Sequence, residues 1–240
     1  MIDLHCHLLP GIDDGPDTLE QSLALARHAV AAGIAHATVT PHMHAGRYDN
    51  RAANIRQAMI GFQRTLDEHG IRLGLRAAAE VRLDHEVLTW VAEGQVPFLG
   101  RWKGENVMLL ELPHSHVPVG ADKLVEWLLK QGIRPMIAHP ERNKDIMRSI
   151  DKLLPFVRLG CLLQLTAGAV AGAFGEPARL RAVDLLCRGL VTILASDAHN
   201  MEARPPELEP GRLAAARVVG EEESWQLVRE RPAQIIGDAA

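Results

Sequence analysis

Two histidines one residue apart near the start of the chain are the first residues whose spacing suggests chemistry. They end the apolar stretch Met1-Ile2-Asp3-Leu4-His5-Cys6-His7, which is typical of a short strand. Side chains two positions apart on a strand point to the same side, so His5 and His7 can bind one metal ion while Cys6 faces away. Asp14, in the following loop, adds a nearby carboxylate. The remaining ligands must come from other strand ends.

Residues of the same chemical kinds recur where later apolar stretches end. They are His42, Glu80, Glu111, His139, Asp197 and His199. In a barrel of parallel strands, the carboxyl ends of the strands meet at one face, and active sites are built there. Surface solubility alone does not require a histidine or carboxylate at one strand end after another. The pattern therefore predicts one shared site at that face.

With Asp14, the candidate ligands number nine, namely five histidines and four carboxylates. One ion takes about four to six ligands, so this set suits two or three divalent ions. Nitrogen and oxygen donors without sulfur favour manganese, iron or zinc over magnesium or calcium. Such a cluster can generate hydroxide from a bridging water near neutral pH and can hold the oxygens of an anionic substrate. This chemistry is hydrolytic and suits a phosphate ester.

Two arginines follow the candidate ligands closely and fit a phosphate substrate. Arg142 lies just past His139, and Arg204 lies shortly after His199. A guanidinium group pairs with two phosphate oxygens at once and stays charged at any relevant pH. Arg47 and Tyr48 are expected at the rim of the same face.

Short apolar strands and amphipathic helices alternate along the chain, which predicts a parallel α/β arrangement. Strands are expected at about 1–7, 35–40, 71–80, 106–111, 134–139, 160–165 and 191–195. Helices are expected at about 18–33, 52–69, 84–92, 121–131, 177–188, 212–219 and 221–229, with a further helical segment ending near 159. The length and the absence of a linker favour a single domain over 1–240.

The bulk composition excludes several classes of protein. A net charge of −4 gives no basic surface for nucleic acid or for anionic membranes. The first residues leave no room for a signal peptide, and no apolar run reaches the length of a membrane span. We therefore expect a cytoplasmic protein without membrane insertion. The oligomeric state is not predicted.

The three cysteines do not support a cysteine-dependent phosphatase. Such enzymes carry an arginine six positions after the nucleophile, whereas Ile12, Ala167 and Ile193 occupy the corresponding positions here. An odd number of scattered cysteines also does not form a disulfide framework. Phosphate ester cleavage by this chain is thus expected to proceed without a thiolate.

The motifs taken together resemble the polymerase-and-histidinol-phosphatase (PHP) superfamily. The motifs are His5-Cys6-His7, Gly11-Ile12-Asp13-Asp14-Gly15, Thr40-Pro41-His42, Ala79-Glu80, Leu110-Glu111, His139-Pro140-Glu141-Arg142 and Ser196-Asp197-Ala198-His199-Asn200. Within the superfamily, the chain is most similar to the bacterial metal-dependent tyrosine-protein phosphatases of capsule and exopolysaccharide operons. The resemblance runs in order from residue 1 to about Pro206.

The resemblance implies a fold, a metal site and a substrate. The fold is a distorted seven-stranded (β/α) barrel whose active site lies at the carboxyl ends of the strands. Three ions are implied, one held by His5, His7, Glu80 and Asp197, a second by Glu80, Glu111 and His139, and a third by Asp14, His42 and His199. Arg142 and Arg204 would bind the phosphoryl group. The implied enzyme is a manganese-dependent protein-tyrosine phosphatase, a phosphoric monoester hydrolase acting on the phosphotyrosine tail of a tyrosine autokinase that controls polysaccharide synthesis.

Three other functions remain open at this point. They are a small-molecule phosphatase of the histidinol-phosphatase type, an amidohydrolase acting on C–N bonds, and a non-catalytic metal-binding PHP subunit.

Several residues are left outside the ligand set. Asp13 is expected to serve the turn, His44 is not counted as a ligand, and His114 and His116 are expected in an active-site loop.

Overall fold

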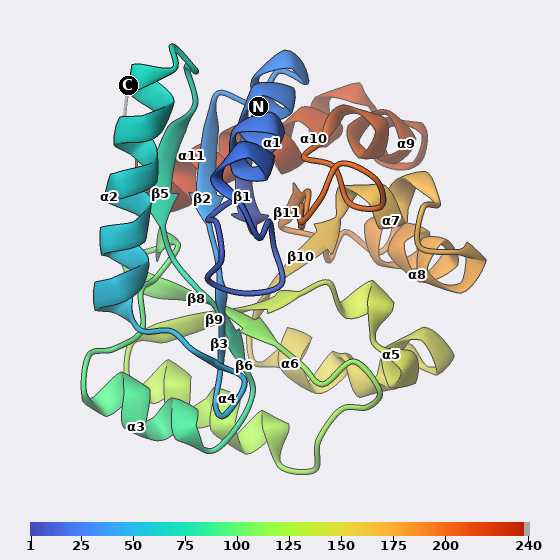
Figure 1. The fold of residues 1–240 in the computed structure, drawn as a ribbon. Helices are drawn as coiled ribbons and strands as arrows, with labels where there is room; N and C mark the ends of the chain where they lie inside the picture. Colours follow the sequence, from blue (N-terminus) through green and yellow to red (C-terminus); the bar gives the residue numbers. More distant parts are fainter. Residues whose placement is uncertain (238–240) are drawn as a thin grey trace.

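Seven parallel strand positions close into a barrel in the computed structural model, which describes residues 1–237 (Figure 1). The strands are β1 (Ile2–Cys6), β2 (His36–Val39), β3 (His42–His44), β4 (Tyr48–Asp49), β5 (Gly74–Ala77), β6 (Glu80–Arg82), β7 (Gly100–Trp102), β8 (Glu105–Glu111), β9 (Ile133–Ala138), β10 (Leu162–Thr166) and β11 (Ile193–Ala195). β2 and β3 share one position, and β5 and β6 share the next. The order around the barrel is β1, β2/β3, β5/β6, β8, β9, β10 and β11, with every neighbouring pair parallel.

The barrel closes where the residues after β11 meet β1. Cys6 forms a parallel bridge with Ala198, and the backbone N–H of Asp197 donates to the carbonyl of His5 at 2.8 Å. The N–H of His7 donates to the carbonyl of Ala198, also at 2.8 Å. The predicted parallel α/β barrel is therefore confirmed, and its closure brings the first and last candidate ligands together.

The barrel is distorted in its second and third strands. β2 ends before Thr40 and Pro41, and proline cannot donate a ladder hydrogen bond. The neighbouring strand breaks between β5 and β6 as well, so the predicted strands 35–40 and 71–80 each form two shorter ones that extend further along the chain. Beyond the breaks, His42 pairs in register with Glu80. The two irregularities thus place two candidate ligands side by side.

Helices follow most of the barrel strands and cover the outside of the barrel (Figure 1). They are α1 (Leu19–Ala31), α2 (Ala52–Glu68), α3 (Glu86–Ala92), α4 (Ala121–Lys130), η1 (Pro140–Arg142), α5 (Lys144–Arg148), η2 (Ile150–Lys152), α6 (Leu154–Arg158), α7 (Ala167–Ala171), α8 (Glu176–Cys187), α9 (Glu209–Val219), α10 (Glu221–Trp225), η3 (Gln226–Glu230) and α11 (Arg231–Ile236). Thr18 caps α1 through a capping box with Gln21, which agrees with the helix start predicted at this residue. Within residues 1–237, no helix combines the length and apolar character needed to cross a bilayer.

The hydrophobic core has two parts, one between the barrel and its helices and one inside the barrel. Inside, alternate residues of the strands pack together, as Val107 and Leu109 of β8 do with Met136 of β9. Ile235 of α11 belongs to this inner cluster, so the end of the chain closes the amino-terminal end of the barrel. Gly100 permits this contact, because a Cβ atom there would lie 1.9 Å from the carbonyl oxygen of Ile235. The opposite end of the barrel is left for the candidate site.

Candidate metal centre

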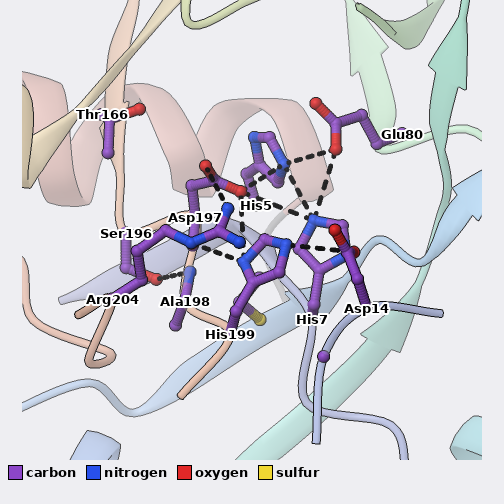
Figure 2. A network of polar contacts seen from close by, with 12 residues as sticks. His5, His7, Asp14, Glu80, Thr166, Ser196, Asp197, Ala198, His199 and Arg204 are labelled. Atoms are coloured by element: carbon purple, nitrogen blue, oxygen red, sulfur yellow. Dashed lines mark hydrogen bonds and ion pairs between the residues drawn. The ribbon is translucent and has the colours of Figure 1, made fainter. Parts of the chain in front are cut away.

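The first group of donor atoms surrounds the end of β1 (Figure 2). The Nε2 atoms of His5 and His7 lie 3.3 Å apart. His5 Nε2 is 3.2 Å from Glu80 Oε2 and 3.2 Å from Asp197 Oδ1. All four side chains are almost completely buried. The strand spacing of the two histidines therefore has the predicted result, with both rings on one side and two carboxylates beside them.

A second group lies around Asp14, nearer the surface. Asp14 Oδ1 is 3.2 Å from His42 Nε2 and 3.3 Å from His199 Nε2. The ring of His199 stacks on that of His7, with centroids 3.9 Å apart, so this group adjoins the first. Partial burial opposes ionisation of Asp14, but the imidazoles of His199 and His42 beside it lower the pKa of its carboxyl group below the usual range.

A third group is centred on Glu80, whose two oxygens face different partners. Oε1 is 2.7 Å from His139 Nε2, and Oε2 is 3.1 Å from His42 Nδ1. Glu111 joins His42 and Glu80 in this group, and its other contact is an ion pair of 2.9 Å with Arg82. The resemblance implied Glu80, Glu111 and His139 together, whereas in the structure the donor atoms of His42, Glu80 and Glu111 all lie within 4.8 Å of one another.

The donor atoms have the spacing of ligands that share ions. Most of the distances between them fall between 3.1 Å and 3.5 Å. Two ligands about 2.1 Å from one ion lie about 3.0–3.5 Å apart. Among the described residues, Glu80 Oε2 and His199 Nε2 are buried without a hydrogen-bond partner. Buried polar atoms rarely lack partners, so the residues present fit divalent ions.

The outer nitrogens of three histidines are held by neighbours. His5 Nδ1 donates to Gln164 Oε1 at 2.9 Å, and His7 Nδ1 donates to Asp13 Oδ2 at 2.6 Å. His199 Nδ1 donates to the carbonyl of Asp197 at 2.9 Å. Each contact leaves the Nε2 lone pair directed into the donor cluster, as metal-binding histidines require.

Two of these supporting residues were not anticipated. Asp13 does serve the turn, because its Oδ1 accepts the N–H of Gly15 at 3.0 Å, but it also orients His7. Gln164 was not singled out at all. Its only signal in the sequence is a polar side chain between the leucines of β10, and polar side chains buried in a strand are usually hydrogen-bonded to a specific partner.

The backbone is unusual at two candidate ligands. His139 and Asp197 have φ values of 30° and 53°, in the left-handed region that non-glycine residues seldom adopt. The turn at Asp197 is held by Asp3, whose Oδ1 accepts the N–H of Ser196 at 3.0 Å and whose other oxygen accepts the Ser196 hydroxyl. Ser196 Oγ in turn accepts the N–H of Ala198 at 3.1 Å. Such strain persists where the surroundings fix it, typically at functional sites.

Two carboxylates at the centre of the site are ionised although they are buried. Burial opposes the ionisation of Glu80, but His5 and His42 hold the pKa of its carboxyl group well below the usual range. Burial also opposes the ionisation of Asp197, and there His5 and Arg142 hold the pKa well below the usual range. Both carboxylates are therefore ionised in a buried pocket, which favours cations.

The two predicted arginines lie above these carboxylates. Arg142 Nη1 contacts Asp197 Oδ2 and lies 3.3 Å from Thr166 Oγ1, while the guanidinium group stacks on Phe174 at 4.5 Å. Arg204 Nη1 is 3.5 Å from the same Asp197 oxygen. Both arginines line a cavity of about 320 Å³, called the central cavity below.

Most of the wall of the central cavity consists of residues that the sequence had marked. Seven of the nine candidate ligands line it, namely Asp14, His42, Glu80, Glu111, His139, Asp197 and His199, and His5 and His7 contact these from below. Its rim includes Arg47 and Tyr48, as expected, and Tyr48 stacks on His42 with centroids 5.5 Å apart. His44 and His114 also line the cavity, but His116 does not.

Comparison with known proteins agrees with this arrangement. A family model described as "Capsular polysaccharide synthesis, CpsB/CapC" matches residues 1–237. The tyrosine-protein phosphatase YwqE of Bacillus subtilis is 37% identical over 204 residues, which cover 85% of this chain and 79% of YwqE. The tyrosine-protein phosphatase CpsB of Streptococcus pneumoniae is 26% identical over 244 residues, covering 99% of both chains.

Solved structures extend the comparison to three dimensions. A structure from work on B. subtilis YwqE and S. pneumoniae CpsB, described there as "unique metal-dependent tyrosine phosphatases", matches with a TM-score of 0.90 and 33% identity, covering 98% of this chain and 94% of that one. The phosphotriesterase homology protein of Escherichia coli matches with a TM-score of 0.59 at 14% identity, over 99% of this chain and 98% of that one, and shows the shared barrel fold alone. The chain therefore belongs to the CpsB/CapC family of capsular polysaccharide synthesis.

Proposed function

We propose that this protein is a metal-dependent protein-tyrosine phosphatase whose nine clustered donors hold two or three divalent ions, with manganese as the expected metal. The observation that carries the proposal is the meeting of these donors beneath two arginines in one cavity. The relatives named as tyrosine-protein phosphatases support the reaction class.

The proposed ligand groups follow the clusters of donor atoms. His5, His7, Glu80 and Asp197 would hold one ion, and Asp14, His42 and His199 would hold another. Glu80 and Glu111 would hold a third ion together with His139 or His42. Glu80 is the proposed bridging ligand, because its two oxygens face different histidines.

When bound, the ions would supply Lewis-acid chemistry, activating water and neutralising phosphate charge. The protein itself would orient the substrate. Arg142 is held by Asp197, Thr166 and Phe174, so its guanidinium group is fixed before a phosphoryl group arrives. Arg204 approaches the same position from the loop after His199. Fixed cations of this kind stabilise the negative charge that develops during phosphoryl transfer.

The cysteines do not offer a competing nucleophile. None of the three lines the central cavity. Cys6 is buried, and its thiol donates to the carbonyl of Thr38 at 3.4 Å. Burial raises the pKa of Cys161 to about 12, so this thiol stays protonated at neutral pH. The third, Cys187, is exposed at the end of α8.

The proposed substrate is the phosphotyrosine-bearing tail of a tyrosine autokinase that acts in capsule or exopolysaccharide synthesis. The family description and the names of the relatives support this class of partner. The test combines elemental analysis of the purified protein with assays on a phosphotyrosyl peptide before and after chelation. We expect turnover to be lost with chelator, restored by manganese and unaffected by thiol alkylation.

The same assay separates the alternatives. Faster turnover of histidinol phosphate than of the peptide would identify a small-molecule phosphatase. Tight metal binding without turnover of any phosphate ester would identify a non-catalytic subunit. Rapid inactivation by thiol alkylation would contradict the metal-dependent mechanism.

A further inference from the structure

An apolar groove lies beside the central cavity, between α3 and the loop that leads into α4. Its volume is about 580 Å³, and its apolar wall is formed mainly by Leu83, Leu88, Val119, Leu124 and Trp127. Val119 is fully exposed, at 107%, and Leu88 is 41% exposed. Two large apolar side chains thus stand open to solvent at one hollow, which is the usual mark of a binding surface.

Two segments of the chain each form part of a wall of the groove and part of a wall of the central cavity. Along the first wall, Arg82 lines the cavity and the next residue, Leu83, lines the groove. The N–H of Leu83 donates to the carbonyl of Glu111 at 2.8 Å, which ties the groove to a candidate ligand. Along the second wall, His114 lines the cavity and Val119, five residues later, lines the groove. The segments that line the groove therefore continue directly from those that line the proposed phosphate site.

The loop that forms the second wall is held in place by side chains that follow Arg142 in the sequence. Asn143, which follows Arg142, donates from Nδ2 to the carbonyls of Pro113 at 2.7 Å and His116 at 3.0 Å. Asp145 Oδ2 accepts the N–H of Val117 at 3.2 Å. The loop is thus fixed on one side by side chains of the segment that carries Arg142, and the groove is formed before any ligand binds.

We propose that the apolar groove binds the peptide chain next to the phosphotyrosine, taking a large apolar or aromatic side chain of the substrate protein. This inference rests on the proposed phosphatase function. Because neighbouring residues line the cavity and the groove, the side chain would belong to a residue close to the phosphotyrosine in the substrate sequence. The rim of the groove carries Asp84 and Lys123, which have opposite charges, so the groove has no preference for an anion.

The test compares three substrates on the metal-loaded enzyme. They are a phosphotyrosyl peptide with leucines on both sides of the phosphotyrosine, the same peptide with serines in their place, and p-nitrophenyl phosphate, which is too small to reach the groove. The variants are Val119→Glu and Leu88→Glu. The matched control is Leu180→Glu, because Leu180 is 54% exposed on α8 and lies outside the groove.

We expect the wild type to show a lower KM for the leucine peptide than for the serine peptide. Each groove variant should raise the KM for the leucine peptide on the order of tenfold, with kcat little changed. Turnover of p-nitrophenyl phosphate should stay at the wild-type level, which also shows that the variants are folded. Leu180→Glu should behave as the wild type on all three substrates.

Three results would overturn the proposal. Equal KM values for the two peptides in the wild type would refute the groove alone and leave the phosphatase function standing. A change of association state in Val119→Glu by sedimentation, with the peptide KM unchanged, would assign the groove to contact between copies of the chain. A wild type that hydrolyses p-nitrophenyl phosphate but neither peptide would refute the proposed function and this inference with it.

Discussion

Glu80 has its two carboxylate oxygens among four imidazoles, those of His5, His7, His42 and His139. Glu80→Gln removes the negative charge of the carboxylate. It also replaces one acceptor oxygen with an NH2 donor that faces histidine nitrogen atoms. We expect the bound metal to fall below the wild-type content and phosphatase turnover to fall at least about 100-fold. Elemental analysis together with the peptide assay tests this. The exposed Glu93→Gln is the control, and a full metal content in Glu80→Gln would contradict the bridging role.

Gln164 acts through the residues that it holds. Its Oε1 accepts from His5 Nδ1 at 2.9 Å and from the N–H of His139 at 3.3 Å, so one amide oxygen fixes two candidate ligands. Gln164→Leu keeps the volume but removes the acceptor, and we expect metal affinity to fall about 10–100-fold. Gln164→Glu keeps an acceptor oxygen, so its metal affinity should fall less than that of Gln164→Leu. Competition with a chromophoric chelator measures the affinity, and equal affinity in the two variants would show that the hydrogen bonds are not needed.

Arg142 should affect the reaction without affecting the metal. Arg142→Lys keeps the charge but loses the planar pair of donors and the stacking on Phe174. We expect kcat/KM for the phosphotyrosyl peptide to fall on the order of 100-fold, while the metal content stays at the wild-type level. Arg148→Lys, at an exposed position of α5, is the control. Loss of metal in Arg142→Lys would mean that Arg142 supports Asp197 and has no direct role toward phosphate.

At the scale of elements, the contact between β7 and α11 closes the end of the barrel opposite the site. In Gly100→Ala the new methyl group would meet the carbonyl of Ile235, so α11 must shift. Overpacking of this kind typically costs about 1–3 kcal/mol of stability. Gly61→Ala in α2, where a Cβ would meet nothing within 4 Å, should instead stabilise by about 0.5–1 kcal/mol. Chemical denaturation measures both changes, and a neutral Gly100→Ala would show that α11 adapts freely.

The elements differ in how far the sequence could predict them. β8 and β9 contain short apolar runs bounded by polar residues, and this pattern was enough to identify them. Pro41 accounts for the break after β2, but the break after β5 falls at Ala78-Ala79, which carries no such signal and is seen only from the pairing of His42 with Glu80. α11 was not predicted, because its place is set by the inner cluster that it packs on rather than by its own pattern. The supporting role of Gln164 was likewise not predicted, because its partner His5 lies 159 residues away in the sequence.

At the scale of the whole molecule, the candidate ligands come from the ends of strands distributed around the entire barrel. β1, β8, β9 and β11 each end in or beside one of them, whereas β3 and β6 begin with one, His42 and Glu80. The ionised carboxylates of Glu80 and Asp197 repel each other unless cations lie between them. Bound ions would therefore join the strands at this face, and metal binding should be coupled to the stability of the fold.

This coupling predicts a metal-dependent melting temperature. An ion that binds only the folded state adds about 2.7 kcal/mol at a free concentration 100 times its dissociation constant. For a chain of this size, that corresponds to a rise of about 5–10 °C. We expect Tm to increase steadily with added manganese and to return to its starting value with chelator. Glu80→Gln should show a clearly smaller rise, because its proposed bridging oxygen is lost. A Tm that is the same in manganese and in chelator would mean that the ions do not hold the strand ends together.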